Sequence, residues 1–268
     1  MQIKSFEDML QANIPVALAK SELHVSLYLV DGLLIDTGPS REAEMISSLL
    51  SQWEFDQVVL THHHEDHTGL APWIQEQKQV PLYIHEKGID LCRKKAKLPL
   101  YRRLFWGKRL AFEPEAISST LQSEHYTWEV IHTPGHAIDH IALYNREKGW
   151  MFGGDLYVQP RPKSMFRFED VPLLIKSLRK LLSYDFTTYF CQHAGIILDG
   201  KKAIRQKLDY LMSAQQEILF MHNEGKSTKQ IQQELFPKKH MMNYYSFGES
   251  SPRHFIHSIT HVTSDSTK

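Results

Sequence analysis

Cysteine is nearly absent from this chain: only Cys92 and Cys191 occur in 268 residues. Two thiols in so long a chain cannot form the framework of a disulfide-stapled fold, which indicates a reducing compartment. Long apolar runs are absent as well, since no stretch of 18 apolar residues occurs and no transmembrane helix is predicted. The first ten residues, MQIKSFEDML, lack the apolar run of a signal peptide. We therefore expect a cytoplasmic protein without a membrane partner.

An excess of charge of either sign is also lacking. Lys plus Arg and Asp plus Glu number 31 each, so the net charge points to neither a nucleic acid nor an anionic surface. Internal repeats and low-complexity segments are missing too. The hydrophobic fraction of 42% is ordinary for a globular chain and suffices for the core of one large domain. The residue present in unusual number is histidine, with 16 copies, several of them in compact motifs.

The hydrophobic pattern predicts a mixed α/β body followed by a helical segment. Alternating or short apolar runs predict strands, and 3.6-residue periodicity predicts helices. The expected strands are 23–36 (two strands around a turn at Asp31 and Gly32), 57–61, 82–85, 127–132, 138–144, 150–153 and 187–191. The expected helices are 41–53 with Ser40 as its cap, 86–96, 173–182, 201–236 and 252–262, with 98–124 irregular and 263–268 disordered. We divide the chain into a catalytic domain, 1–200, and a helical C-terminal extension, 201–268.

The first chemical motif is H-x-H-x-D-H at residues 62–67, directly after a predicted strand. Side chains alternate in an extended loop, so His62 and His64 point the same way and can hold one metal ion, while His63 points away. Asp66 and His67 follow where the chain turns into a helix and can reach a second ion. Imidazoles with a carboxylate suit zinc, iron or manganese. The alternative is a solvated polar loop.

Three weaker motifs also follow predicted strands. In the segment 132–140, HTPGHAIDH, Pro134 and Gly135 force a tight turn that lets His136 project from the strand end. Two glycines precede Asp155, whose two oxygens can bridge two cations. His193 follows a buried strand and precedes a glycine. Strand ends are rigid mounts around a shared crevice, as metal ligands require. For His132 and His140 we expect supporting or structural roles.

Taken in order and at these separations, HHHEDH, TPGH, GGD and QHAG resemble the metallo-β-lactamase-fold hydrolases over about residues 20–200. The resemblance implies an α/β fold, an αββα sandwich with the metals at one edge, here with a helical C-terminal extension. It implies two divalent metal ions, zinc before iron or manganese, and a metal-bridging hydroxide as nucleophile. Asp66 would receive the proton, and Asp36 resembles a buried aspartate that orients a ligand histidine. The implied ligands are His62, His64 and His136 for the first metal, Asp66, His67 and His193 for the second, and Asp155 as the bridge.

The HTPGHAIDH segment and the helical C-terminal part are most similar to the glyoxalase II-like group, which implies hydrolysis of small esters and thioesters. The exported β-lactamases of this fold carry a cysteine ligand, which argues against lactam hydrolysis here. Tyr157, two residues after Asp155, is a candidate for holding a carbonyl oxygen or else an aromatic packed under the loop. A metal-dependent phosphodiesterase or ribonuclease is the alternative function, with RNA as its partner in place of a small-molecule substrate.

One segment departs from the balance of charge. Residues 93–109 contain eight Lys or Arg and no acidic residue, with Tyr101, Phe105 and Trp106 between them. The segment is either a solvated face or a basic rim that draws an anionic substrate toward the metals. Basic residues interleaved with aromatics would also suit single-stranded nucleic acid. We expect this segment and the helices beyond Lys201 to border the active site on two sides.

Overall fold

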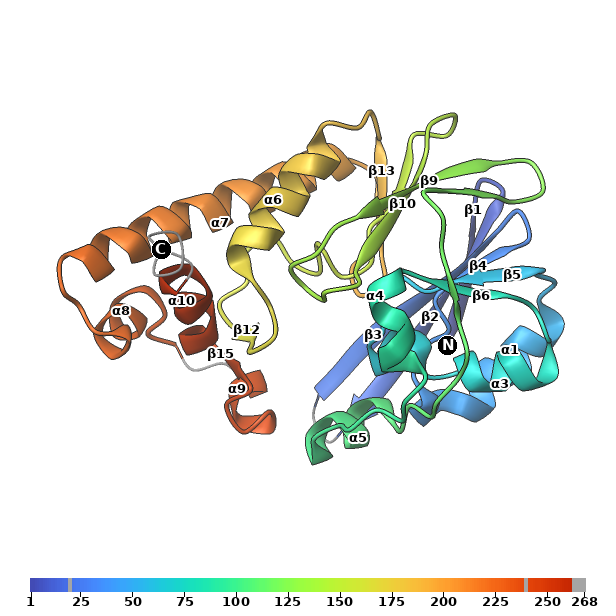
Figure 1. Ribbon diagram of the computed structural model, residues 1–268, viewed down its shortest axis with the longest axis horizontal. Coiled ribbons are helices and arrows are strands. Elements are labelled where there is room, and N and C mark those ends of the chain that lie inside the picture. The colour runs from blue at the N-terminus through green and yellow to red at the C-terminus, as the bar shows by residue number, and fades with distance from the viewer. Residues whose placement is uncertain (19–20, 239–240, 262–268) are drawn as a thin grey trace.

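Two β-sheets stack face to face at the centre of the computed structural model, which describes residues 1–18, 21–238 and 241–261 (Figure 1). The first sheet contains, in spatial order, β1 (Gln2–Phe6), β2 (Met9–Leu18), β3 (Ser21–Val30), β4 (Leu33–Ile35), β5 (Gln57–Val59), β6 (Leu82–Ile84) and β7 (Glu115–Ala116). The second contains β14 (Gly195–Ile197), β13 (Thr188–Cys191), β11 (Trp150–Phe152), β10 (Ile141–Asn145), β9 (Thr127–His132) and β8 (Thr120–Gln122).

The central strands bury both of their faces, which is why their sequences are almost continuously apolar, whereas the edge strands β1, β7 and β8 are largely exposed. On β10, Ile141 and Leu143 pack between the sheets, while Ala142 and Tyr144 face the helices outside. Alternation of this kind follows from the two-residue period of a strand. The result is three apolar layers, one between the sheets and one on each outer face. The αββα sandwich expected from the motifs is confirmed.

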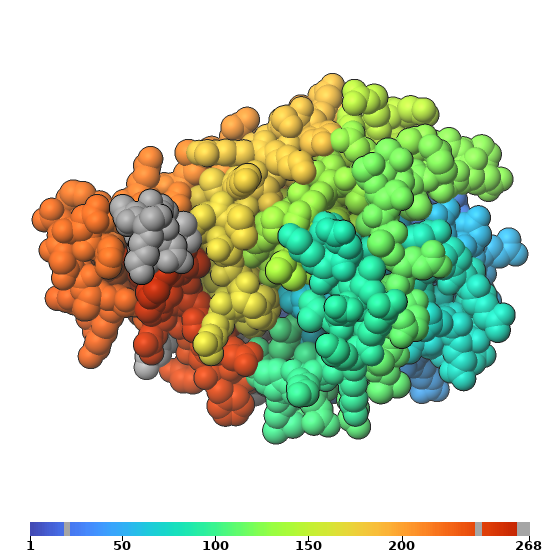
Figure 2. Space-filling view, in the orientation of Figure 1, coloured from blue at the N-terminus to red at the C-terminus, as the bar shows by residue number. Residues whose placement is uncertain are grey.

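Helices cover both outer faces. The first sheet is covered by α1 (Ala43–Gln52), α3 (Ala71–Gln77) and α4 (Glu86–Cys92), and the second by α6 (Val171–Leu182) and α7 (Gly200–Asn223). Beyond α7, the chain forms α8 (Thr228–Leu235), α9 (Met241–Tyr245) and α10 (Pro252–Thr260), and a small sheet pairs β12 (Met165–Phe166) with β15 (Ser250–Ser251). Figure 2 shows these C-terminal segments, orange to red, forming one end of the molecule. No helix in the described part of the chain is long and apolar enough to cross a membrane.

The expected helix boundaries were wrong where side chains from distant segments bind at the ends of the helices. Ser40 does not cap a helix: it begins a short 3-10 turn, Ser40–Glu42, and its Oγ donates to the carbonyl oxygen of Lys108 at 2.8 Å. Helix α4 ends at Cys92 and not at Ala96, because the Arg109 guanidinium binds the carbonyl oxygens of Leu91 and Cys92. These carbonyl groups are thereby satisfied without another helical turn.

The segment 98–124 is not irregular throughout, as we had expected. It contains α5 (Leu100–Trp106), on which Tyr101 and Phe105, four residues apart, form one buried stripe. The predicted helix 201–236 is interrupted at Gly225, whose φ of 81° is outside the helical region. Strand β10 begins at Ile141 rather than at residue 138, because the preceding residues form the turn around His136. The predictions for Val262 and for the tail 263–268 lie outside the described residues.

Candidate metal centre

The HHHEDH loop leaves the end of β5 and enters the short helix α2 (Glu65–Thr68). His62 and His64 turn toward each other, with 2.9 Å between His62 Nε2 and His64 Nδ1. His63 points elsewhere, as alternation predicts, and its Nδ1 donates to Asp139 Oδ1 at 2.7 Å. The imidazoles of His62 and His64 therefore lie together, and the imidazole of His63 binds the neighbouring loop through Asp139.

His136 completes the first group of possible ligands. Its Nε2 lies 3.1 Å from His64 Nδ1, and one nitrogen of each of His62, His64 and His136 lies within 4.8 Å of the others. The preceding Gly135 has a φ of 132°, and a Cβ there would stand 2.5 Å from the backbone nitrogen of Leu174. Only glycine allows this close approach, which explains the turn that aims His136 inward.

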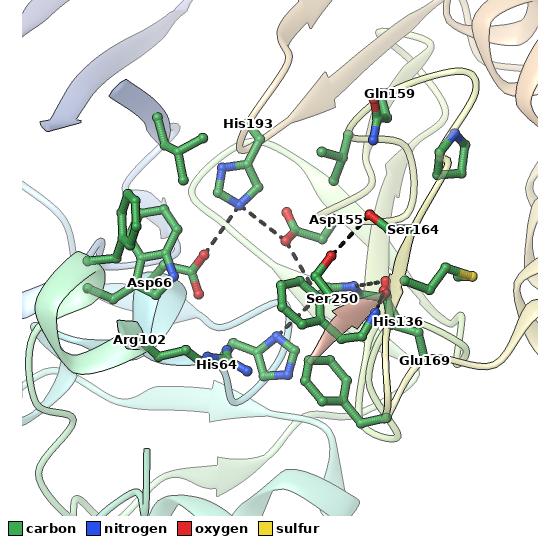
Figure 3. A pocket seen from close by; sticks show the side chains of 18 of the residues that line it. His64, Asp66, Arg102, His136, Asp155, Gln159, Ser164, Glu169, His193 and Ser250 are labelled. Carbon is green, nitrogen blue, oxygen red and sulfur yellow. Dashed lines mark hydrogen bonds and ion pairs between the residues drawn. The ribbon is translucent and has the colours of Figure 1, made fainter. Parts of the chain in front are cut away.

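A second group adjoins the first and contains two carboxylates. Asp155 Oδ2 lies 3.4 Å from His67 Nε2. It also lies 3.2 Å from His193 Nε2, which lies 3.3 Å from Asp66 Oδ2 (Figure 3). The same Asp155 oxygen lies 3.5 Å from His136 Nε2, so this carboxylate faces both groups. The structure thus brings together all seven residues that the motifs and the resemblance single out.

The chemistry of the donors fits cations between them. His67 Nε2 and Asp155 Oδ1 are buried and have no hydrogen-bond partner within the described residues. Burial lowers the pKa of His62 well below its usual value, and the nearby His67 and His64 imidazoles lower it further. The neutral imidazole that results is the form that binds metals. Nitrogen lone pairs converging at such distances, with an unpartnered carboxylate oxygen beside them, are donors that zinc binds.

In the second group, the carboxylates raise the pKa values of the histidines instead of lowering them. Burial would lower the pKa of His193, but Asp155 and Asp66 outweigh it and raise that pKa well above its usual value. Burial would likewise raise the pKa of the Asp155 carboxyl, yet His193 and His67 hold it well below its ordinary range. Positive charge is thus favoured between these side chains, and a bound cation can take the place of the protons.

Hydrogen-bond acceptors fix the far side of three of the histidine rings. His67 Nδ1 donates to Asp36 Oδ2 at 2.8 Å, which confirms that this aspartate orients a motif histidine. His136 Nδ1 donates to Glu169 Oε1 at 2.9 Å, and His193 Nδ1 donates to the carbonyl oxygen of His24 at 2.8 Å. Such partners fix the tautomer that leaves the other nitrogen free for a metal. Glu169 was not predicted, since it stands 33 residues from His136 and belongs to no motif.

The other candidates play supporting parts or lie outside the site. His140 Nε2 accepts from the backbone N–H of Asp155 at 3.1 Å, so it holds that carboxylate in place. His132 stacks on His85 with ring centroids 4.1 Å apart and does not reach the two groups. Tyr157 is half-buried against the outer core beside Tyr189 and is not part of the cavity wall. Of the two alternatives for Tyr157, the structure supports an aromatic residue packed under the loop.

A cavity of about 520 Å³ opens over both groups. Helix α5 supplies one wall through Tyr101, Phe105 and Trp106, and Lys207 and Ser250 come from the C-terminal segments. The expected two-sided border is confirmed. Arg102 also lines the cavity, where Nε and Nη2 donate to the two Glu65 carboxylate oxygens at 2.6 and 2.9 Å.

The basic segment divides between two surfaces. Arg102, His64 and Phe168 belong both to the metal cavity and to a neighbouring cavity of about 830 Å³. The second cavity, here called the basic cavity, is lined by His63, His64, Glu65, Leu91, Lys94, Lys95, Ala96, Lys97, Leu98, Pro99, Arg102, Arg109, Arg167, Phe168 and Glu249. Arg109 is buried and binds backbone carbonyl groups, so the accessible positive charge comes from the lysines and Arg167. The aromatic side chains of α5 face the metal cavity instead.

Residues 22–193 match the family model described as "Metallo-beta-lactamase superfamily". Among curated proteins, the chain is similar to the "Probable metallo-hydrolase YqjP" of Bacillus subtilis, with 27% identity and 86% of each chain covered. It is 24% identical to the "Atrochrysone carboxyl ACP thioesterase" of Aspergillus fumigatus over 70% of this chain and 55% of that one. It is 29% identical to the "Hydroxyacylglutathione hydrolase" of Idiomarina loihiensis over 60% of this chain and 55% of that one.

Solved structures share the fold at lower identity. A metallo-beta-lactamase family protein from Thermus thermophilus superimposes with a TM-score of 0.66 at 18% identity, covering 94% of this chain and 91% of that one. A beta-lactamase domain protein from Burkholderia ambifaria gives a TM-score of 0.68 at 19% identity, covering 94% and 85%. Both likenesses extend through the C-terminal helices, since they cover more of the chain than residues 22–193.

Proposed function

Because this chain belongs to the metallo-beta-lactamase superfamily, we propose that it holds two divalent cations and hydrolyses small anionic thioesters or esters. That it is a metal-dependent hydrolase follows from the family and from relatives named as hydrolases and thioesterases. The number of cations, their ligands and the substrate are the proposal. The observation that carries it is the convergence of seven buried or nearly buried donors in two adjoining groups.

We assign the first cation to His62, His64 and His136, and the second to Asp66, His67 and His193, with Asp155 between them. When bound, two such cations would lower the pKa of a water molecule so that hydroxide is available at neutral pH, and would polarise the ester carbonyl group. The protein holds these donors rigidly through Asp36, Glu169 and the carbonyl group of His24. Zinc suits this donor set, and iron or manganese would also fit it.

Asp66 is the residue proposed to take up the proton of the nucleophile. Burial would raise the pKa of its carboxyl, but the charge of His67 and the hydrogen bond from His193 outweigh burial and lower it. The group is therefore ionised at neutral pH and able to accept a proton. One of its oxygens faces His193 Nε2, and the carboxylate lines the cavity where the ester would lie.

The cavity walls support an acyl substrate with an anionic partner group. Aromatic side chains of α5 form one wall of the metal cavity, and Arg102 lines both this cavity and the basic cavity. A thioester could thus place its carbonyl at the metals and an anionic thiol portion among the lysines. Two of the relatives are named as enzymes of thioester chemistry, a carboxyl ACP thioesterase and a hydroxyacylglutathione hydrolase.

The structure does not favour the phosphodiesterase or ribonuclease alternative. That alternative depended on aromatic and basic side chains alternating along one surface. The aromatics Tyr101, Phe105 and Trp106 line the metal cavity, whereas Lys94, Lys95 and Lys97 line the basic cavity, in which Phe168 is the one Phe, Tyr or Trp among the described lining residues. Single-stranded RNA stacks successive bases on several aromatic side chains along one basic groove.

The proposal is tested by hydrolysis with a panel of matched substrates. We expect the metal-loaded protein to cleave a small anionic thioester such as S-lactoylglutathione. It should cleave the corresponding oxygen ester more slowly and leave bis(p-nitrophenyl) phosphate nearly untouched. His64→Ala should abolish the activity and His63→Ala should retain it. Faster cleavage of the phosphodiester than of every thioester and ester would contradict the proposal.

A further inference from the structure

Lys207 is a buried lysine in the wall of the metal cavity. It lies in the first half of α7, is 5% exposed, and lines the same cavity as His136, Asp155 and His193. Its Nζ donates a hydrogen bond to the carbonyl oxygen of Tyr157 at 2.5 Å. An ammonium group has three donors, and residues 1–18, 21–238 and 241–261 offer Lys207 no second partner. Lysine is seldom buried without a pairing group.

The acidic side chain of the wall that acts most strongly on Lys207 is already engaged. Glu169 accepts a hydrogen bond from His136 Nδ1 through one oxygen and from the backbone N–H of Phe166 at 2.7 Å through the other. Burial lowers the pKa of Lys207 to about 8, although Glu169 acts to raise it. A buried lysine with a single hydrogen-bond partner is thus present beside the proposed reaction site.

Lys207 lines the metal cavity and not the basic cavity. Other wall residues of the metal cavity, Met165, Leu174 and Ser250, are at most 3% exposed. Arg102 lines both cavities. A bound thioester therefore has room for its thiol portion on the Arg102 side, in the basic cavity, which leaves its acyl group in the metal cavity, whose wall includes Lys207.

We propose that Lys207 sets the acyl specificity of this enzyme by binding a carboxylate at the far end of the acyl group. The preferred substrates are then thioesters of short dicarboxylic acids. A carboxylate supplies both the missing negative charge and the acceptors for the free donors, and a charge-assisted pair of this kind is stronger where water is excluded. This inference rests on the proposed function, because it assigns the two halves of the substrate from the hydrolytic site.

The test compares two acyl groups of similar length on one thiol, the succinyl and pentanoyl thioesters of N-acetylcysteamine. Only the succinyl group carries a terminal carboxylate. We expect kcat/KM to favour the succinyl thioester by about 10- to 100-fold, the size expected for hydrogen bonds to a charged group. Lys207→Met should remove that preference by lowering the succinyl value alone. Lys202→Met, on an exposed face of the same helix, makes the same change in charge and should keep it.

Binding of the product acids supplies a second readout. Isothermal titration of the metal-loaded proteins with succinate and pentanoate should show tighter succinate binding in the wild type and in Lys202→Met, but not in Lys207→Met. Equal losses on both thioesters, with reduced metal content, would mean that Lys207 only fastens the loop through Tyr157, and would overturn the inference. Absence of any preference in the wild type would overturn it without a variant. If no thioester is cleaved, the proposed function fails, while the succinate titration still decides the role of Lys207.

Discussion

Replacing Asp36 with asparagine should weaken one metal site and leave the other intact. Asp36 is fully buried and has a φ of 60°, a conformation that asparagine also tolerates, so the backbone should not change. Its Oδ1 accepts from the backbone N–H of Thr61 at 2.8 Å, and its Oδ2 accepts from His67 Nδ1 at 2.8 Å. An amide oxygen can replace only one of these acceptors.

If that oxygen stays with Thr61, the amide NH₂ faces His67 and donates to its Nδ1. The proton of His67 must then move to Nε2, the nitrogen that faces Asp155. Loss of such a buried partner lowers metal affinity or activity by about 10- to 100-fold, or about 1.4–2.8 kcal/mol. The weakened cation is the one assigned to Asp66, His67 and His193.

Chelator competition on Asp36→Asn should therefore show one metal equivalent bound as in the wild type and one released at lower chelator concentration. Asp199→Asn is the control, because Asp199 also accepts a hydrogen bond, from the backbone N–H of Lys202 at 3.4 Å, and asparagine caps a helix as well as aspartate does, while Asp199 belongs to neither donor group. It should keep both equivalents. A folded Asp36→Asn protein with two equivalents of unchanged affinity and wild-type kcat would refute this account of His67.

Three further predictions concern the loop, the thiol and the basic cavity. His63→Ala should keep at least about a third of the activity, because the His63 imidazole binds Asp139 and not the donor groups. An inactive variant that is folded and fully metallated would contradict the alternation of side chains along this loop. Cys191→Ser should keep the full metal content, because this thiol is packed in the apolar layer under α6 and α7 and belongs to neither donor group; loss of one equivalent would show otherwise. Neutralising the three lysines of the basic cavity should raise KM for an anionic thioester about 3- to 10-fold at low salt and flatten its salt dependence; unchanged kinetics would mean a solvated face. The substitutions are Lys94→Gln, Lys95→Gln and Lys97→Gln combined.

The strand-end motifs could be placed from the sequence because their signals are local. Alternation alone predicted that His62 and His64 converge and that His63 turns away, and the structure shows both. The turn at Gly135 and the strand before His193 likewise lie where short apolar runs end. The family and the αββα fold are confirmed. The ligand assignments remain predictions, since they depend on cations.

The features that sequence reasoning missed depend on contacts between distant segments. The N-terminal hairpin β1–β2 was not predicted, although β2 is half of a ten-residue ladder with β3. Helix α5 was missed because only two of its seven residues are buried. Lys207 occupies a position that looks like the polar face of an amphipathic helix, and only the path of the loop after Asp155 places it in the cavity wall. The ion pair of Glu65 could not be predicted, because its partner, Arg102, is 37 residues away in the sequence.

Metal stoichiometry tests the central claim most directly. After removal of bound metal with a chelator and reconstitution with zinc, elemental analysis should give two equivalents per folded chain. His193→Ala should reduce the value to about one equivalent, because it removes a ligand of the second cation only. His132→Ala should leave two, because that imidazole stacks on His85 outside both groups. A wild-type protein that binds one equivalent or none under these conditions would contradict the two-cation site.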